Sequence, residues 1–522
     1  MKRYTKLAVV TASAALMSLG LSSMAFAASN GTWKVVDGDW YCYNSSGDVY
    51  TDTFCNSNGK EYYVGDDGRL VRSDWVEYDG DYYFVNSAGQ KITNDWRMTS
   101  PYWDEDGDEQ WYYFQATGKM AYDKKLTYKG STYYFDGEGT MLTGWVSDSD
   151  GTIQSADSAE PDETYFCDET GARIQSGWVV STEPGTDEDD ADADEYWYYL
   201  KSSGKLATGK QTNIKGQMYF FDGEGRMLSG WVAYDGDSYF EIDGEDSDAE
   251  LRADAYTAVY YCGGEDDGHA KKNKWMKLWR PADTYEEDSD VDSYWYWIAA
   301  DGKIYIPSDA DAEADRYTLG DGEMEFQSTT TATKKKINSK EYFFNANGEM
   351  LSDFVKMTAS NANIASGLYY FGDEDDGSMK TGSQSVKDDN DETYKFYFGT
   401  KAVSSTGEAK GVGITGNKSG KLYFNGLLIR ADDYKYQTAT IDGHTFIVNQ
   451  NGSIQHSQVE YKEDGDILID TSTEKAGDTV VYQISYTNSN DQWEDSIDEN
   501  ASIGTLRDYT DPIDIYSVMN VQ

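Results

Sequence analysis

Aromatic residues recur along the chain in short clusters, each followed by a polar, glycine-containing segment and then by a methionine or leucine. One copy runs from Tyr133-Tyr134-Phe135 through Asp136-Gly137-Glu138-Gly139 to Met141 and ends at Gly144-Trp145. The segment from Tyr219 to Trp231 repeats this order of residue types. Uninterrupted copies lie roughly twenty residues apart, as from Phe114 to Phe135. Weaker copies begin at Tyr82, Tyr112, Tyr198, Tyr342, Tyr369 and Tyr397, with degenerate ones at Tyr423 and Phe446.

Each copy predicts one β-hairpin. The aromatic cluster favours a short strand, the Asp-Gly segment a tight turn, and the methionine or leucine the start of the return strand. A lone hairpin is marginal in water, so units this short must bury their aromatic faces on their neighbours. A buried aromatic ring removes about 150–250 Å² from water, so the rings alone can supply a core. We therefore predict an all-β fold, an elongated solenoid of stacked short hairpin repeats.

The two ends of the chain differ from the repeats. Residues 1–27 have the layout of an export signal, with basic residues, an apolar run from Leu7 to Leu21 that is short for a bilayer span, and small residues up to Ala27. We expect cleavage after Ala27 and a mature chain that is secreted and held non-covalently at the cell-wall surface, without membrane insertion. The repeats are expected to fill residues 28–457. Residues 458–522 remain an unassigned, small β-rich tail, in which Thr479–Tyr486 reads as a strand.

Acidic residues dominate the charge: the 522 residues include 94 Asp and Glu against 44 Lys and Arg, for a formal net charge of −50. Because basic side chains supply most of the affinity for phosphate backbones, this composition argues against a nucleic-acid partner. The acidic insertions are predicted to be solvated loops; they cover residues 148–163, 183–195, 243–250 and 283–292.

Calcium is the alternative role for the acidic clusters Asp104–Asp108 and Asp373–Gly377. Neither has the ligand spacing of an EF-hand loop, so we assign no metal site.

Four cysteines fall near positions that Phe84, Phe135 or Leu200 occupy in other copies, which predicts small, inward-facing apolar side chains. They are Cys42, Cys55, Cys167 and Cys262. A bridge between Cys42 and Cys55 is the alternative in an exported protein, because the two are close in sequence.

Catalytic motifs are absent from the sequence: His269, His444 and His456 lie in no HExxH, CxxC or Gly-x-Ser-x-Gly context. A glycosidase needs only two suitably spaced carboxylates, but hairpins this small form no deep cleft. We therefore predict a non-catalytic protein without a cofactor.

Aromatic side chains at the junctions between hairpins are the candidate chemistry. Three facing rings can hold a quaternary ammonium, each contributing about 0.5–2 kcal/mol, and several such grooves gain avidity on a repetitive polymer. The alternative is that these rings only pack one repeat on the next. The predicted ligand-binding groups are Trp75 with Tyr82 and Trp96, Trp96 with Trp111, Trp145 with Tyr165, Trp178 with Trp197, and Trp231 with Tyr239.

The spacing Trp-x₄-Gly-x-Tyr-Tyr-Phe-x₄-Gly, at Trp75 to Gly89, and Gly-x-Met-x-x-Gly-Trp, at Gly139 to Trp145, resembles the choline-binding, or cell-wall-binding, repeat family of exported Gram-positive proteins. The resemblance covers residues 31–455 with insertions. It implies a left-handed solenoid in which choline on teichoic acid sits between aromatic residues of consecutive repeats. The lysines at Lys124-Lys125 and Lys210, in place of Gly-Trp, are also similar to the glucan-binding repeats of glucosyltransferases and to toxin repeats, which implies a neutral sugar.

Three hypotheses follow. The leading one is a non-catalytic secreted surface protein that binds cell-wall polymers through choline-type teichoic acid ligands. The alternatives are a repeat protein that binds a neutral surface glycan such as glucan, and a structural surface spacer. Tryptophan is absent from the repeats after Trp297, so residues 300–455 are expected to be scaffold only.

Overall fold

The computed structural model describes residues 29–495 except 187–191, 243–250, 252, 282–291, 405–406, 433, 442–443, 456–459, 471–484 and 488–492. The expected export signal, residues 1–27, lies outside the described residues. The acidic insertion at 243–250 also lies outside the described residues, as do residues 283–291 of the insertion at 283–292 and residues 187–191 of the insertion at 183–195. Of the strand predicted at Thr479–Tyr486, only Ser485 and Tyr486 are described, at the start of β39 (Ser485–Thr487).

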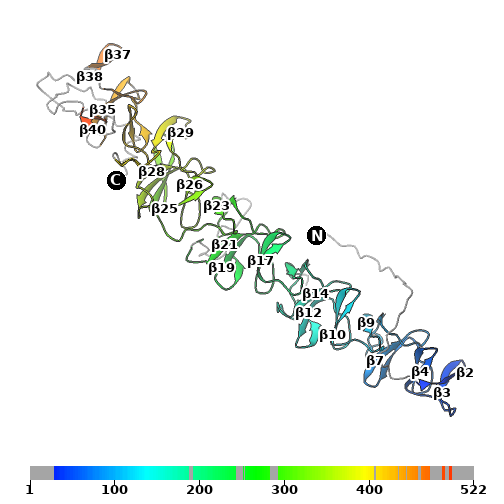
Figure 1. Cartoon of the computed structure of the whole chain (residues 1–522). Coiled ribbons are helices and arrows are strands. Elements are labelled where there is room, and N and C mark those ends of the chain that lie inside the picture. Colours follow the sequence, from blue (N-terminus) through cyan, green and yellow to red (C-terminus); the bar gives the residue numbers. More distant parts are fainter. Residues whose placement is uncertain are drawn as a thin grey trace. The chain divides into compact units, whose positions relative to one another are not determined.

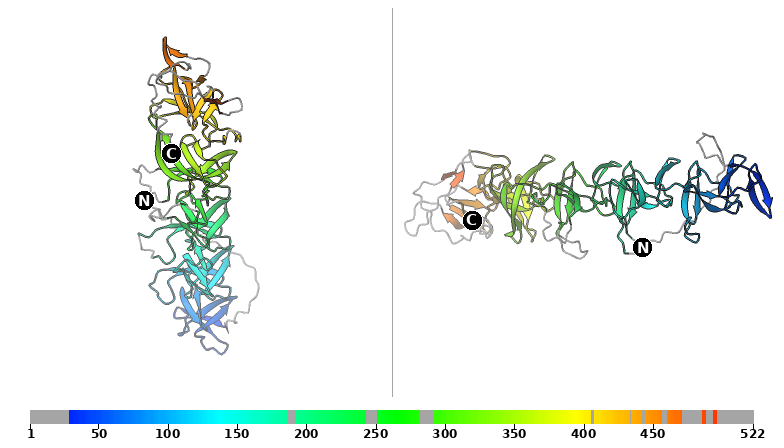
Figure 2. Two further views of the ribbon diagram at one scale, coloured as in Figure 1. Left: turned by 90° about the vertical axis from the view of Figure 1, so that its left-hand side faces the viewer. Right: turned by 90° about the horizontal axis from the view of Figure 1, so that it is seen from below.

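Short antiparallel strands make up the secondary structure, and the all-β hairpin prediction is confirmed (Figures 1 and 2). The part of the chain that the structure describes contains no helix, and so none that is long and apolar enough to cross a membrane. The chain divides into two compact units. Unit 1 comprises residues 1–208 and 223–226, and unit 2 comprises residues 209–222 and 227–522.

Unit 1 is a succession of hairpins, each of two antiparallel strands joined to the next by a glycine-containing loop. The strand pairs are β2 (Thr32–Val36) with β3 (Asp39–Tyr43), β4 (Thr53–Ser57) with β5 (Lys60–Val64), β6 (Asp74–Tyr78) with β7 (Asp81–Val85), β8 (Asp95–Thr99) with β9 (Gln110–Phe114), β10 (Lys124–Tyr128) with β11 (Ser131–Phe135), β12 (Gly144–Ser149) with β14 (Thr164–Cys167), and β15 (Gly177–Ser181) with β16 (Tyr196–Leu200). The short β1 (Ser29–Asn30) pairs with β4 in parallel.

In the hairpins without an insertion, such as β6–β7 and β10–β11, the tight turn lies before the aromatic cluster, which corrects the predicted phase of the repeat. Between β6 and β7, Asp79 and Gly80 have φ values of 54° and 77°, the left-handed pair that suits a two-residue hairpin turn. The Asp136–Gly139 segment, predicted as the turn, instead begins the loop to the next hairpin. There Asp136 Oδ1 accepts the backbone N–H of Thr140 at 2.7 Å. Met141 forms a single bridge with Phe135 and opens no strand.

The loops between hairpins hold consecutive repeats together. Met120 N–H donates to Tyr82 O of the preceding hairpin at 2.8 Å, and Met141 N–H does the same to Trp111 O at 2.9 Å. The Met120 side chain packs directly on Gly139, where a Cβ would overlap its sulfur. Gly139 has φ 83°, so it meets both the conformational and the steric requirement of this contact. Backbone bonds and a methionine-on-glycine contact therefore fix the register of neighbouring hairpins.

Unit 2 begins with the same kind of hairpin. Its first strands are β17 (Gly209–Ile214) with β18 (Gln217–Phe221), β19 (Trp231–Tyr234) between β20 (Tyr239–Glu241) and β21 (Ala258–Tyr261), and β22 (Lys274–Leu278) with β23 (Tyr294–Ile298). The last strands are β34 (Tyr436–Ile441), β35 (His444–Asn449) and β36 (Ile454–Gln455), then the pairs β37 (Glu460–Glu463) with β38 (Asp466–Asp470) and β39 with β40 (Trp493–Asp495).

Between residues 312 and 428 the strands form larger sheets than the repeat pattern indicated. β25 spans 14 residues, and its threonine-rich middle is favourable for an extended strand. Its first part pairs with β24 and its last part with β26, so one strand serves two hairpins. Phenylalanine, leucine and isoleucine take over the core here, as in the cluster around Phe396, Phe398 and Ile429. The first sheet has the order β26 (Lys340–Phe344), β25 (Met324–Ile337), β24 (Ala312–Leu319), β27 (Phe354–Ala359), β28 (Gly367–Tyr370), and the second the order β29 (Gly382–Lys387), β30 (Thr393–Phe398), β33 (Leu427–Leu428), β32 (Lys421–Phe424), β31 (Gly416–Lys418).

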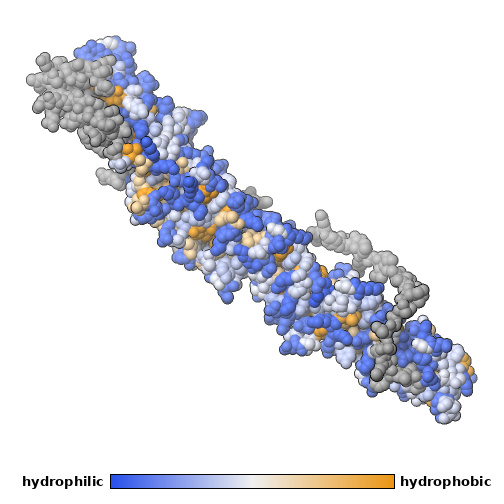
Figure 3. All heavy atoms as spheres, in the orientation of Figure 1, coloured by the Kyte–Doolittle hydropathy of each residue, from blue (hydrophilic) through white to orange (hydrophobic). Residues whose placement is uncertain are grey.

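The acidic insertion at 148–163 is not purely a loop. It contributes β13 (Thr152–Ser155), which pairs with β12 and buries Ile153. Figure 3 shows that hydrophilic residues cover most of the visible described surface, and hydrophobic ones appear in small patches.

The cysteines are buried, as predicted: all four are free thiols with 0% exposure. Cys42 and Cys167 lie on β3 and β14, at the end of an aromatic cluster, and Cys262 directly follows β21. Cys55 differs, because it lies on the first strand, β4, opposite Tyr62.

Candidate functional site

A tryptophan at the start of a hairpin contacts a tyrosine of the following hairpin, and this contact recurs through both units. Ring centroids lie between 4.8 and 5.7 Å apart in these pairs, and most pairs meet edge to face. The tyrosine is always the third of the five residues of the second strand of the next hairpin. The pairs are Trp33–Tyr62, Trp75–Tyr112, Trp96–Tyr133, Trp145–Tyr198, Trp231–Tyr296 and Trp275–Tyr342.

The indole N–H groups show how such a junction is normally closed. Trp75 Nε1 donates to Ser100 O at 2.9 Å, Trp145 Nε1 to Thr182 O at 2.8 Å and Trp231 Nε1 to Trp279 O at 3.1 Å. Each acceptor carbonyl follows the first strand of the next hairpin. These tryptophans therefore hold neighbouring repeats together by both ring packing and a hydrogen bond.

The predicted groups are realised only in part. Trp178 and Trp197 do meet, with centroids 6.1 Å apart. Trp75 and Tyr82 share one face of their hairpin, but the inserted Tyr102 lies between them, stacked on Tyr82 at 3.8 Å and 5.8 Å from Trp75. This box is filled by the chain itself, and Trp96 belongs to the next junction.

The structure does not bring two of the predicted pairs together. Trp145 pairs with Phe166 across the strands and Tyr165 pairs with Val146, so the two rings point to opposite faces. Trp145 is 8% exposed and lies in the buried cluster that contains Tyr198, whereas Tyr165 lies in the buried cluster that contains Tyr134. Trp231 packs against Tyr261 and Tyr296, whereas Tyr239 stacks on Tyr234 at 4.5 Å in a separate cluster.

Trp96 and Trp111 lie on the same face of one hairpin, at diagonal positions of the register. Trp96 packs on Tyr113 and Tyr133, both with centroids 5.0 Å away. Trp111 leaves 42% of its surface exposed, next to Met98, which is 43% exposed. This junction keeps an accessible aromatic surface.

The first junction of the described chain contains a pocket of about 200 Å³ that the sequence prediction missed. Trp33 and Trp40 form one wall from the first hairpin, and Tyr62 faces them from the second. Trp40 is 41% exposed, so its ring face is open to solvent. The lining residues are Trp33, Trp40, Ser57, Tyr62, Leu70, Arg72 and Ala88.

Two polar groups distinguish this pocket from the closed junctions. Trp33 Nε1 is buried and has no hydrogen-bond partner, unlike the indole N–H of Trp75 or Trp145. An unsatisfied buried donor is costly, so a bound acceptor atom would be stabilising here. Arg72 is exposed at the rim and donates to Ser87 O at 3.1 Å, which fixes its guanidinium beside the rings.

The motif that revealed Trp75 also contains the pocket residues. Trp33, Gly38 and Trp40-Tyr41-Cys42 repeat the spacing of Trp75, Gly80 and Tyr82-Tyr83-Phe84, with cysteine in place of the phenylalanine. The cysteine and the second tryptophan hid this copy from the aromatic-cluster pattern.

Other junctions hold a cation supplied by the chain itself. Lys91 Nζ lies 4.7 Å from the Phe54 ring centroid and 5.4 Å from that of Tyr83, and it pairs with the Glu61 carboxylate. Lys210, which replaces a tryptophan, places its Nζ 5.1 Å from the Tyr260 ring. Such rings already face a positive charge.

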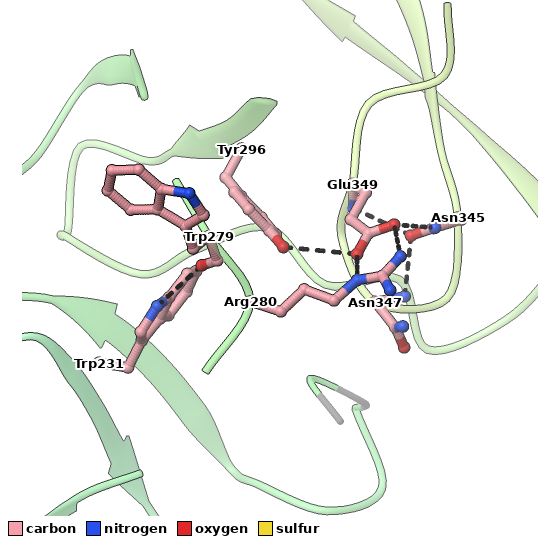
Figure 4. Close-up of polar contacts among 7 residues, drawn as sticks. All are labelled: Trp231, Trp279, Arg280, Tyr296, Asn345, Asn347 and Glu349. Carbon is pink, nitrogen blue, oxygen red and sulfur yellow. Dashed lines mark hydrogen bonds and ion pairs between the residues drawn. The ribbon is translucent and has the colours of Figure 1, made fainter. Parts of the chain in front are cut away.

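Arg280 makes the most elaborate of these contacts, and Figure 4 shows its bonds to Glu349. Its guanidinium lies 4.3 Å from the Tyr294 ring and donates to both oxygens of Glu349, at 2.5 and 3.1 Å. Glu349 is 3% exposed and also accepts from Asn345 Nδ2 at 2.7 Å. The bond to Glu349 raises the pKa of Arg280, so the guanidinium stays charged and the contact is structural.

The acidic clusters considered for calcium bond to their own backbone. Asp373 Oδ1 accepts the N–H of Asp376 at 3.1 Å, and Asp104 Oδ1 that of Asp106 at 3.3 Å. Over the described residues, no group of three or more His, Cys, Asp or Glu side chains is placed to hold a metal ion.

Comparisons with known proteins agree with this geometry. The profile of the choline-binding repeat matches residues 105–145, which include Trp111 and Tyr133, and that of a putative cell wall binding repeat matches residues 192–206 and 335–350. Glucosyltransferase-S of Streptococcus mutans is 29% identical over 201 residues, 38% of this chain and 12% of the relative. Glucosyltransferase-I of Streptococcus downei is 25% identical over 370 residues, 65% of this chain and 20% of the relative. A putative endo-beta-N-acetylglucosaminidase of Streptococcus pneumoniae is 25% identical over 130 residues, 25% of this chain and 15% of the relative.

The matched region is thus between 12% and 20% of the length of these relatives. Among solved structures, the modular autolysin LytC of Streptococcus pneumoniae has 21% identity and a TM-score of 0.33, over 62% of this chain and 53% of that one. Choline binding protein F of the same organism has 17% identity and a TM-score of 0.33, over 68% and 99%. At residues 105–145 the chain matches the choline-binding repeat, and at residues 192–206 and 335–350 it matches the putative cell wall binding repeat.

Proposed function

We propose that this chain is a non-catalytic, exported binding protein that attaches to cell-wall polymer through open aromatic junctions between its hairpins. The observation that carries the proposal is the pocket of Trp33, Trp40 and Tyr62, which combines three aromatic side chains with an apolar wall from Leu70. Choline-binding repeats elsewhere in the chain support it. The Trp96–Trp111 junction is the second proposed site, because Trp111 is exposed.

The ligand proposed for this pocket is the phosphocholine substituent of a wall teichoic acid. Its ammonium would lie against the rings, each worth about 0.5–1 kcal/mol at an exposed site. Arg72 would neutralise the charge of its phosphate, and one phosphate oxygen would accept the indole N–H of Trp33. Choline without the phosphate would leave the Arg72 charge next to the ammonium uncompensated.

A neutral glycan is the second candidate. Three relatives that match more than a third of this chain are glucosyltransferases. The free indole N–H and the guanidinium of Arg72 are both donors, and sugar hydroxyls accept such bonds while the ring face of a sugar stacks on tryptophan.

Titration calorimetry with phosphocholine, choline and maltodextrin separates these candidates. We expect phosphocholine to bind more tightly than choline, and Arg72→Gln to remove that difference. Trp40→Ala should weaken phosphocholine binding about two- to fivefold, which corresponds to about 0.5–1 kcal/mol. Trp103→Ala is the matched control, since Trp103 is 53% exposed and lies outside the pocket.

Preferred binding of maltodextrin, with the same dependence on Trp40, would select the glycan. If none of the three ligands binds, or if Trp40→Ala and Trp103→Ala behave alike, the proposed function is wrong.

A further inference from the structure

Two buried thiols lie together directly behind the aromatic pocket. Cys42 on β3 and Cys55 on β4 are both 0% exposed and share one buried cluster with Val64. Their side chains are within hydrogen-bonding reach of each other. The backbone of Gly31 closes over the Cys42 sulfur, since a Cβ on that glycine would overlap it. No other cysteine shares this cluster.

The strand register connects these thiols to the pocket. Cys42 is the cross-strand partner of Trp33, and Cys55 is the cross-strand partner of Tyr62. Trp33 and Tyr62 are the two rings that meet across the junction, with centroids 5.7 Å apart. A bond between the two sulfurs would therefore join the two hairpins at the residues that flank the pocket rings.

We propose that Cys42 and Cys55 form a disulfide that covalently joins the first two hairpins of the described chain. We infer the disulfide from the position of the two thiols alone. Its effect on ligand binding rests on the function proposed above. It would fix the separation of the Trp33 and Tyr62 rings before a ligand arrives, which reduces the ordering cost of binding.

The reaction requires a disulfide oxidant, either a small-molecule disulfide or a thiol oxidoreductase. The thiolate of one cysteine attacks the oxidant and forms a mixed disulfide, and the second thiolate then displaces the oxidant. The chain gains one S–S bond and loses two protons and two electrons, and the oxidant is reduced to two thiols.

Folding and oxidation must be ordered in time. Burial raises the pKa of both the Cys55 and the Cys42 thiol, so thiolates are scarce once the hairpins close. We expect the bridge to form while the chain is still unfolded, and the closed cluster then to protect it from reductants.

Cys167 and Cys262 provide an internal control. Both are buried at 0% exposure, but each lies in a separate cluster, Cys167 with Tyr134 and Cys262 with Phe220. Both should remain thiols under conditions that oxidise the other pair.

The test is to refold the full chain with oxidised glutathione, label it with N-ethylmaleimide in denaturant and measure its intact mass. We expect two labels without prior reduction and four after it, since the chain has four cysteines. Peptide mapping should place the unreduced labels on Cys167 and Cys262. Cys42→Ala should raise the unreduced count to three, and Cys167→Ala should lower it to one.

Four labels without reduction, glutathione adducts on Cys42 or Cys55, or a bridge that includes Cys167 or Cys262 would each overturn the proposal. Phosphocholine titration of the oxidised and reduced chain then keeps the two proposals apart. A bridge confirmed by mass, in a chain that binds no ligand in either state, would leave the disulfide established and the proposed function refuted.

Discussion

Lys91 occupies the place between two hairpins that an external ammonium would take in an open junction. Its side chain is 7% exposed, its Nζ lies 4.7 Å from the Phe54 ring and 5.4 Å from the Tyr83 ring, and its ion-pair partner Glu61 is 19% exposed. Lys91→Met removes the charge and keeps most of the apolar stem. The variant therefore isolates what the cation contributes to the stability of this junction.

The expected loss has two parts. Two partly desolvated cation–π contacts are worth about 0.5–1 kcal/mol each, so their loss costs about 1–2 kcal/mol. Glu61 also loses its partner at a largely buried site, which costs roughly 1–2 kcal/mol more. We expect the Lys91→Met variant to be about 2–4 kcal/mol less stable than the wild type. Adding Glu61→Gln should recover the second part, because no carboxylate is then left unpaired.

Hydrogen exchange of the β4–β7 amides, alongside urea unfolding followed by tryptophan fluorescence, is the appropriate assay, because neighbouring repeats can unfold locally. Protection should fall in these four strands and remain unchanged in β15 and β16. A variant whose amides exchange as slowly as those of the wild type would refute the reasoning.

Lys91→Ala extends the same reasoning to a ligand. The truncation leaves space beside Phe54, Tyr83 and the Glu61 carboxylate, which is the environment that a quaternary ammonium requires. Tetramethylammonium should raise the midpoint temperature of this variant and leave that of the wild type unchanged. The neutral isostere of choline, 3,3-dimethylbutanol, should have a smaller effect. Equal stabilisation by both compounds would show that the site recognises shape alone.

Two further predictions concern residues away from the open pocket. Trp145→Ala should lower the free energy of unfolding in urea by about 3–5 kcal/mol, because it removes an 8% exposed ring and its bond to Thr182. The same variant should bind phosphocholine with unchanged affinity. A loss of affinity in the folded variant would show that Trp145 is a ligand-binding residue. Burial raises the pKa of Asp353 to about 6, so the folded chain holds this proton while the unfolded chain releases it near pH 4. The stabilising contribution is present below about pH 4 and is lost as pH rises to about 6, by up to about 3 kcal/mol. Asp353→Asn should flatten this part of the stability–pH curve, and an unchanged curve would contradict the assignment.

The repeat, the all-β class and the burial of the cysteines were predictable, because aromatic clusters at regular spacing have few other ways to leave water. The phase of the hairpin was not. Asp79-Gly80 before one cluster and Asp136–Gly139 after another carry the same turn signals. Only the strand pairing shows which of the two segments is the hairpin turn. The aromatic cluster of β11 pairs with β10, which precedes it, so the turn lies before the cluster.

The partners of the tryptophans were predicted less well, because nearness in sequence does not decide which face of a strand a ring occupies. Trp145 and Tyr165 are close across one sheet yet point to opposite faces, whereas Trp75 meets Tyr112 of the next hairpin. The filling of junctions by Tyr102 or Lys91 depends on tertiary contacts that no local pattern contains.

The contact of one methionine with the next glycine makes the repeats interchangeable. Met120 lies over Gly139, and Met141 lies over Gly171 in the same way. In other units Leu70, Lys91 or Arg173 takes the place of the methionine over the next glycine. Such units share a protruding side chain at one end and a matching recess over a glycine at the other. Duplication, loss or exchange of a whole unit would preserve both ends, so a gene for such a chain can change its number of hairpins in single recombination steps while the remaining repeats keep their fit.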